Sequence, residues 1–194
     1  MSRTEPQEMA MFLARFSDKA LIHSDRPIKL KGGRESNWYI DGRAGFAEGS
    51  LLRKAAELMI NRAASVGAKY DIVAGEGVGG TALSSAIGVL KPSCDITTIN
   101  NNQAMGQRYG YGLHGAKVVG KKVFEVDDTA TSGDSLITAI SMVRQGGGKV
   151  EYAATLCDRS EGAAAAQLGE IGIKFFSVFE FIEEKGMLVP SPDL

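Results

Sequence analysis

The fold is decided by one stretch of the chain, Val123-Phe124-Glu125-Val126-Asp127-Asp128-Thr129-Ala130-Thr131-Ser132-Gly133-Asp134-Ser135. A mostly apolar run enters two adjacent acids and then a series of small residues, which predicts a strand over 122–126 and a helix over 134–145. The turn between them places consecutive backbone N–H groups at a helix N-terminus. Such amides and the helix dipole favour an anion, so the stretch predicts a phosphate-binding turn.

The two acids before this turn, Asp127 and Asp128, repel a phosphate if they approach it directly. They fit the site if they accept hydrogen bonds from sugar hydroxyls, or hold Mg²⁺, one sugar length away. A ribose 5-phosphate meets both conditions. The simpler alternative is a helix N-cap after an ordinary strand, but a cap needs one polar residue and this run supplies seven.

Outward from this stretch, strand and helix patterns alternate along the 194 residues. Strands are predicted over 28–30, 38–40, 70–74, 95–99, 122–126, 150–157 and 173–178, and helices over 5–20, 49–66, 81–90, 134–145 and 161–168, with a last helical turn within 179–185. This alternation predicts a doubly wound α/β fold with a mainly parallel sheet. Residues 1–45 are expected to form a small N-terminal hood of a helix and short strands, and residues 46–194 the core. Ligands of such sheets bind beyond the carboxyl ends of the strands.

The composition excludes several function classes. Twenty-two basic and 23 acidic side chains give a net charge of -1, so no broad positive field is available for nucleic acid or an anionic membrane. No apolar run approaches the length of a membrane span, and the N-terminus has no signal-peptide pattern. The two cysteines, Cys94 and Cys157, are expected to be buried reduced thiols. These features predict a cytoplasmic protein.

The stretch 123–135 resembles the phosphoribosyl diphosphate (PRPP) signature of type I phosphoribosyltransferases. The resemblance implies that Asp127 and Asp128 contact the ribose hydroxyls and, through PRPP, Mg²⁺. It implies that the loop after them wraps the 5-phosphate. That loop consists of Thr129, Ala130, Thr131, Ser132, Gly133, Asp134 and Ser135. Glu125 departs from the signature, which prefers an apolar residue; a carboxylate there needs a nearby Lys or Arg, or a wetter edge position.

A glycine-rich run follows the strand predicted over 70–74. On its own it is consistent with a flexible turn, but in this context it resembles the diphosphate-binding loop of the same family. The run consists of Gly75, Glu76, Gly77, Val78, Gly79 and Gly80.

Two more segments resemble orotate phosphoribosyltransferases in particular. Residues 29–41 are similar to that family's N-terminal signature, and Lys31 matches the lysine that reaches the active site, although Gly32 and Asn37 replace the usual Ser and Pro. Residues 158–162 are similar to its Asp-Arg-x-Glu-Gly element, so Arg159 is expected to bind the orotate carboxylate. A surface arginine on a loop is the plainer alternative. The resemblance also implies a base contact by Thr131.

The catalytic loop departs from the family pattern. Residues 100–115 are expected to form a mobile loop, and the family's Arg and Lys positions hold Asn, Gln, Met or Gly there. Arg108 and His114 are the only residues of this loop that can be cationic. Cations that meet developing diphosphate charge are usually a large catalytic term, so the sequence predicts weakened turnover unless Mg²⁺, Arg108 or Lys31 compensates.

The primary hypothesis is therefore a Mg²⁺-dependent enzyme of pyrimidine biosynthesis that joins orotate to PRPP and releases diphosphate. Its catalytic residues are expected to be Asp127, Asp128, Lys31 and Arg108. The alternatives are a phosphoribosyltransferase for another anionic base, or a catalytically impaired regulatory protein that binds PRPP or a nucleotide. A homodimer is implied by the resemblance alone, because the family's loop acts across an interface.

Overall fold

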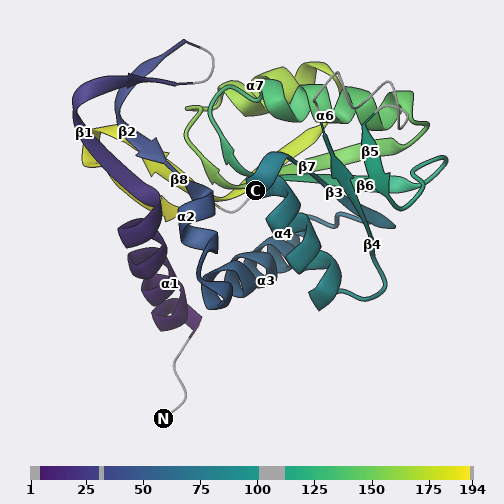
Figure 1. The fold of residues 1–194 in the computed structure, drawn as a ribbon, viewed down its shortest axis with the longest axis horizontal. Coiled ribbons are helices and arrows are strands. Elements are labelled where there is room, and N and C mark those ends of the chain that lie inside the picture. The colour runs from purple at the N-terminus through teal and green to yellow at the C-terminus, as the bar shows by residue number, and fades with distance from the viewer. Residues whose placement is uncertain (1–4, 31–32, 101–111, 193–194) are drawn as a thin grey trace.

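The computed structural model describes residues 5–30, 33–100 and 112–192, which fold around a large sheet with helices on both faces (Figure 1). The strands of the sheet are β3 (Ile72–Glu76), β4 (Asp95–Ile99), β5 (Leu113–Gly115), β6 (Lys122–Ala130), β7 (Lys149–Asp158), β8 (Lys174–Ile182) and β9 (Met187–Pro190). Their order is β5-β4-β3-β6-β7-β8-β9. The edge strands β5 and β9 are antiparallel to their neighbours and the others are parallel, which confirms the predicted doubly wound, mainly parallel fold.

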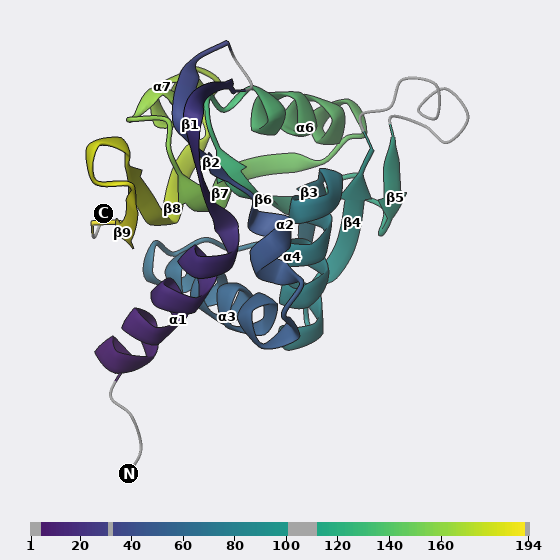
Figure 2. The same cartoon turned by 60° about the vertical axis from the view of Figure 1, so that its left-hand side comes forward.

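The helices divide between the two faces of this sheet (Figures 1 and 2). The first face carries α3 (Gly49–Ser65) and α4 (Gly77–Leu90), and the opposite face carries α6 (Asp134–Gln145) and α7 (Ala163–Glu170). The N-terminal helix α1 (Glu5–Ala20) and the short α2 (Gly42–Phe46) join α3 on the first face. Both faces of the parallel strands are thus covered, as near-continuous apolar strands require.

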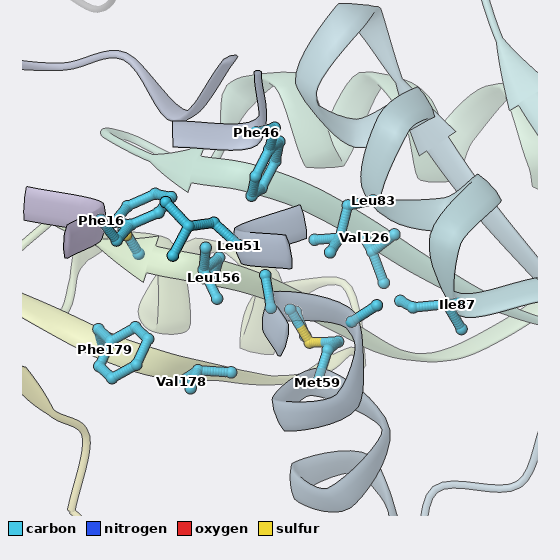
Figure 3. Packing of buried hydrophobic residues seen from close by; sticks show 14 of the residues in the cluster. Phe16, Phe46, Leu51, Met59, Leu83, Ile87, Val126, Leu156, Val178 and Phe179 are labelled. Carbon is cyan, nitrogen blue, oxygen red and sulfur yellow. The ribbon is translucent and has the colours of Figure 1, made fainter. Parts of the chain in front are cut away.

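Two apolar clusters hold these layers together. On the first face, Phe16 from α1, Met59 from α3 and Leu83 from α4 meet Val126 and Phe179 from the sheet (Figure 3). On the opposite face the cluster includes Leu136 and Ile140 of α6 and Leu168 of α7. Each large side chain buried in this way contributes about 1.5–3 kcal/mol relative to an exposed position.

The hood contains a two-stranded antiparallel sheet of β1 (Leu21–Lys29) and β2 (Glu35–Ile40), which lies beside the end of β8 (Figure 1). Trp38 of β2 packs edge-on to Phe181 with ring centroids 6.1 Å apart. It also lies against Gly186, where an added Cβ would lie 2.6 Å from Cε2 of the indole and closer still to Cζ2. Since Gly186 has φ +58, this contact and the backbone both require glycine.

The ends of several elements differ from the sequence expectation. Strand β6 continues to Ala130 because its backbone stays paired with β7, so the paired acids lie inside the strand and not after it. The glycine-rich run is not a loop, since strand β3 ends at Glu76 and α4 begins at Gly77. A helical turn was expected within 179–185. Residues 179–182 instead belong to β8, which pairs with the unpredicted strand β9, so this part of the prediction is wrong. The 3₁₀ turn η1 (Glu183–Lys185) confirms the rest. Part of the expected loop 100–115 is strand β5, and residues 101–111 lie outside the described residues.

Candidate functional site

The site lies where the order of the parallel strands reverses. The chain runs from β3 outward to β4, then returns to the other side of β3 to form β6. Strands β3 and β6 pair in parallel with Gly75 opposite Val126, so the Glu76 end of one strand lies beside Asp127 and Asp128 of the other. Ligands of open α/β sheets bind at this switch point, outside the carboxyl ends of the strands.

The carboxylate of Asp128 is held against the backbone of two glycines. An ideal Cβ on Gly79, in the first turn of α4, would lie 2.6 Å from its Oδ1, and one on Gly42 of α2 would lie 2.7 Å from its Cβ. Any side chain at either glycine would push Asp128 away. The structure therefore joins the glycine-rich run to the paired acids, as expected, and adds Gly42, which the sequence reasoning missed.

Asp127 and Asp128 influence each other's ionisation. The backbone N–H of Asp128 donates to Oδ1 of Asp127 at 2.8 Å. Burial raises the pKa of Asp127 well above its usual range, and the neighbouring Asp128 raises it further. Burial also raises the pKa of Asp128, and the hydrogen bond with Asp127 opposes that shift. The pair holds a proton more readily than two separate aspartates, which lowers its repulsion of a nearby phosphate.

The predicted phosphate turn connects β6 to α6. Gly133 is the N-cap of α6 with φ +94, and its ideal Cβ would lie 3.2 Å from Cα of Ala164, so the position requires glycine. The first intrahelical bond runs from the N–H of Ile137 to the carbonyl of Gly133 at 3.0 Å. The preceding amides of the turn cannot be satisfied within the helix. Ser132 donates to the carboxylate of Asp134 at 2.7 Å, which holds this part of the turn.

Arg159 follows β7, and its N–H donates to the carbonyl of Ala130 at 2.9 Å, beside the end of β6. Its side chain is only 1% exposed. The guanidinium donates at 2.8 Å to the carbonyl of Trp38, to Oγ of Ser36 and to Oε2 of Glu183. Burial lowers the pKa of Arg159 and the charge of Glu183 opposes that shift. A contact with a base carboxylate stays a prediction, since these protein oxygens hold the guanidinium here.

A second arginine ties the hood to this turn. Arg34 donates to Oε1 of Glu161 at 2.7 Å and to the carbonyl of Arg159 at 2.8 Å. Glu161 has φ +54, a conformation that non-glycine residues seldom adopt and that collects at functional sites. Arg34 and Glu161 lie in the segments 29–41 and 158–162 that resemble the family, but only the structure brings them together with Glu183.

Glu125 has no hydrogen-bond partner among the described residues, for either carboxylate oxygen, and it is fully buried. The expected Lys or Arg partner and the expected wetter edge position are therefore both wrong. Burial raises the pKa of Glu125 well above its usual range, and Asp127 and then Glu76 add to the shift. Burial in the centre of the sheet therefore favours the protonated form of this side chain.

Two of the expected catalytic residues, Lys31 and Arg108, lie outside the described residues. Within the described parts of the chain, no cluster of three or more His, Cys, Asp or Glu side chains is suited to a metal ion. None of the helices over residues 5–30, 33–100 and 112–192 combines the length and the apolar content of a bilayer span.

Comparison with known proteins decides the family, although no family model matches the chain. The orotate phosphoribosyltransferase of Sulfolobus acidocaldarius is 33% identical over 189 residues, which cover 93% of this chain and 88% of the relative. The chain belongs to the orotate phosphoribosyltransferase family. Another family member, from Mycobacterium avium, is 31% identical over 92% of this chain and 95% of its own length.

Solved structures of the family agree in fold. Orotate phosphoribosyltransferase of Mycobacterium tuberculosis, crystallised with inorganic phosphate, superposes with a TM-score of 0.73 at 25% identity, covering 90% of this chain and 96% of that one. A phosphoribosyltransferase of Corynebacterium diphtheriae gives the same values. These likenesses confirm the type I phosphoribosyltransferase fold that the stretch 123–135 predicted.

Proposed function

We propose that the protein transfers the phosphoribosyl group of PRPP to orotate, forming orotidine 5-monophosphate and diphosphate. One observation carries this proposal: the paired acids and the turn before α6 lie together at the switch point between β3 and β6. The family membership supports it, because the curated relatives are named for this activity.

The ribose 5-phosphate would bind across β6 and the start of α6. Carboxylates of Asp127 and Asp128 accept hydrogen bonds from the 2- and 3-hydroxyls, and the backbone amides of residues 131–135 hold the 5-phosphate. The hydroxyls of Thr131, Ser132 and Ser135 add donors at the same turn. The Mycobacterium tuberculosis relative was crystallised with inorganic phosphate, which supports an anion site on this fold.

The diphosphate would face the first turn of α4, where the strand ends at Glu76 and Gly77–Gly80 begin the helix. The N-terminal amides of that helix favour the negative charge of the leaving group. During transfer the C1–O bond breaks with its electron pair moving to diphosphate. A ring nitrogen of orotate releases its proton to water and forms the new C1–N bond with inversion. Lys31 and Arg108 are the proposed cations for the departing charge.

Mg²⁺ is the proposed cofactor. The carboxylate oxygens of Asp127 and Asp128 are the hard donors that this ion prefers, but two residues leave most of its six positions open. We therefore assign Mg²⁺ to the complex with PRPP, whose oxygens complete the coordination. The ion supplies neutralisation of the diphosphate charge.

A homodimer and a cytoplasmic location complete the proposal. The family resemblance supports the dimer, because the loop equivalent to residues 100–115 then reaches a neighbouring subunit. Sedimentation equilibrium of the purified protein tests this part, and a monomer at micromolar concentration would contradict it.

The activity is tested by incubating the purified protein with orotate, PRPP and Mg²⁺ and separating the products by chromatography. We expect orotidine 5-monophosphate and diphosphate in equal amounts, and loss of product with EDTA. Asp127→Asn should lower kcat/KM by roughly 10²-fold, by analogy with the loss of one preorganised polar group. Binding of PRPP without any product would show that the transfer itself is absent.

A further inference from the structure

The buried guanidinium of Arg159 is already engaged by a carboxylate of the same chain. Glu183, on the 3₁₀ turn η1, accepts from its Nη2 at 2.8 Å, and the Ser36 hydroxyl donates to the other oxygen of Glu183. The guanidinium carbon lies over the ring of Phe181, 5.2 Å from the ring centroid. The arginine is therefore fixed in position before any base arrives.

The donors of Arg159 show what remains for a ligand. A guanidinium has five N–H groups. Three of them serve Trp38, Ser36 and Glu183, and Nε is buried with no partner among the described residues. Bidentate recognition of a carboxylate needs two adjacent N–H groups. Each adjacent pair includes an N–H of Nη2, so a base carboxylate that binds in this way must replace Ser36 or Glu183 as the acceptor there.

Of these two acceptors, Glu183 is the one that can withdraw. Ser36 is only 6% exposed, whereas the Glu183 side chain is 34% exposed and can turn toward water. The local charges are balanced as they stand, with Arg34 and Arg159 facing Glu161 and Glu183. The carboxylate of a base would be the third in this balanced group, and it can enter favourably only if one of the present carboxylates withdraws.

We propose that Glu183 is a specificity-determining residue that occupies the carboxylate-binding donors of Arg159 and is displaced when the carboxylate of the base binds. The inference rests on the proposed function, because it takes Arg159 as the contact for the base. Glu183 lowers the affinity for a carboxylated base because its own carboxylate competes for the same N–H donors of Arg159. It also keeps the buried arginine neutralised when the base site is empty.

The substitution Glu183→Gln tests this directly, because it keeps the shape and one acceptor oxygen for Arg159 but removes the competing charge and the second acceptor. We expect the KM for orotate to fall about tenfold, equivalent to the loss of one charge-assisted hydrogen bond, with kcat and the KM for PRPP unchanged. The matched control is Glu184→Gln, an exposed glutamate on the same turn, which should leave all three constants unchanged.

A binding measurement separates this inference from the activity. Trp38 is the single tryptophan of the chain, its carbonyl accepts from Arg159 and its ring contacts Gly186 next to η1. Titration with orotate should therefore change its fluorescence, with a Kd about tenfold lower in Glu183→Gln. Uracil, which lacks the carboxylate, should bind both proteins equally.

An unchanged or higher Kd for orotate in Glu183→Gln would overturn the inference, as would equal gains for orotate and uracil. Absence of orotate binding to both proteins would overturn it as well. If the fluorescence result is as expected but no product forms, the competition stands and the proposed transfer fails. If product forms with the same KM in both proteins, the transfer stands and the competition fails.

Discussion

At the scale of single residues, Glu125 and the Asp127–Asp128 pair show how burial changes the charge state of acids. Glu125 has no polar partner among the described residues, and its environment raises its pKa well above the usual range. The aspartates differ because they reach the ligand end of the strand and retain partial exposure. Burial of the unpartnered Glu125 carboxyl therefore weakens the fold, whereas Asp127 and Asp128 are the acids that we propose bind the ribose.

We expect Glu125→Leu to stabilise the protein, because an unsatisfied buried polar group costs about 1–3 kcal/mol. The increase in the free energy of unfolding that Glu125→Leu gives should become larger as the pH rises. Above the unfolded pKa near 4.5 the unfolded chain releases the proton that folded Glu125 keeps, so each pH unit lowers the free energy of unfolding by up to about 1.4 kcal/mol until the folded pKa is reached. Urea unfolding at pH 5 and pH 8 measures both effects.

The control for this prediction is Glu170→Gln, an exposed glutamate at the end of α7, which should not change the pH slope. A less stable Glu125→Leu protein, or a stability difference that does not vary with pH, would show that Glu125 has a partner and remains charged.

At the scale of elements, the first turn of α4 is shaped to receive Asp128. Gly79→Ala would place a Cβ 2.6 Å from Oδ1 of Asp128, so the carboxylate must move away from the ribose position. We expect the Kd for PRPP, measured by calorimetry, to rise at least about tenfold, the equivalent of one lost hydrogen bond to a charged group.

Gly169→Ala is the matched control, because a Cβ there meets nothing within 4 Å. It should leave the affinity for PRPP unchanged and raise the stability by up to about 1 kcal/mol, as expected for glycine replaced in a helix. Equal PRPP affinity in the two variants would contradict the placement of Asp128 beside α4.

The backbone that flanks residues 101–111, at Asn100 and Gly112, has a specific requirement of its own. Asn100 donates its N–H to the carbonyl of Gly112 at 2.9 Å, and Gly112 has φ +67. An added Cβ there would lie 2.7 Å from Cε of Met142 and closer still to the carbonyl of Asn100. We expect Gly112→Ala to lower kcat while the affinity for PRPP in the absence of base stays within about twofold, because the 5-phosphate turn is untouched. Steady-state kinetics measures kcat and calorimetry measures the affinity for PRPP. An equal loss of kcat and of PRPP affinity would contradict the prediction.

The sequence predicted the element types well, because apolar periodicity and turn residues are local signals. The chain order of the parallel strands, the helix α6 and the turn before it followed from them, whereas α2, β5 and β9 were not predicted. Strand ends did not, since β6 continues through Asp127 only because β7 pairs with it. The setting of Arg159 was also beyond reach, because its partners Trp38 and Ser36 are 121 and 123 residues away.

At the scale of the whole molecule, contacts from both the helix and the sheet of the hood attach it to the core. Phe12 of α1 stacks on Phe179 of β8 with ring centroids 5.6 Å apart. The β1–β2 sheet is held by Trp38 against Gly186 and by the hydrogen bonds of Arg159. The C-terminal part of the sheet therefore supports the hood.

We expect Gly186→Ala to loosen this attachment. The new Cβ would lie 2.6 Å from Cε2 of Trp38 and closer still to Cζ2, and the residue would keep a positive φ, for a total cost of roughly 2–4 kcal/mol. Thermal unfolding measures the loss, and the fluorescence of Trp38 should shift to longer wavelength as the ring becomes exposed to water.

Gly172→Ala separates the two causes, because Gly172 has φ +75 but open space around its Cβ position. This variant should lose only the stability that a positive φ costs a non-glycine residue, and the fluorescence of Trp38 should not change. If both variants lose the same stability, the contact between the hood and η1 contributes nothing.

The central claim is that the amides after the paired aspartates hold a sugar phosphate while the aspartates hold its hydroxyls. A crystal structure of the protein with orotidine 5-monophosphate tests it most directly. We predict phosphate oxygens within about 3.2 Å of backbone nitrogens in residues 131–135, and ribose hydroxyls within about 3.2 Å of Asp127 and Asp128. A nucleotide bound with its phosphate away from that turn would contradict the account.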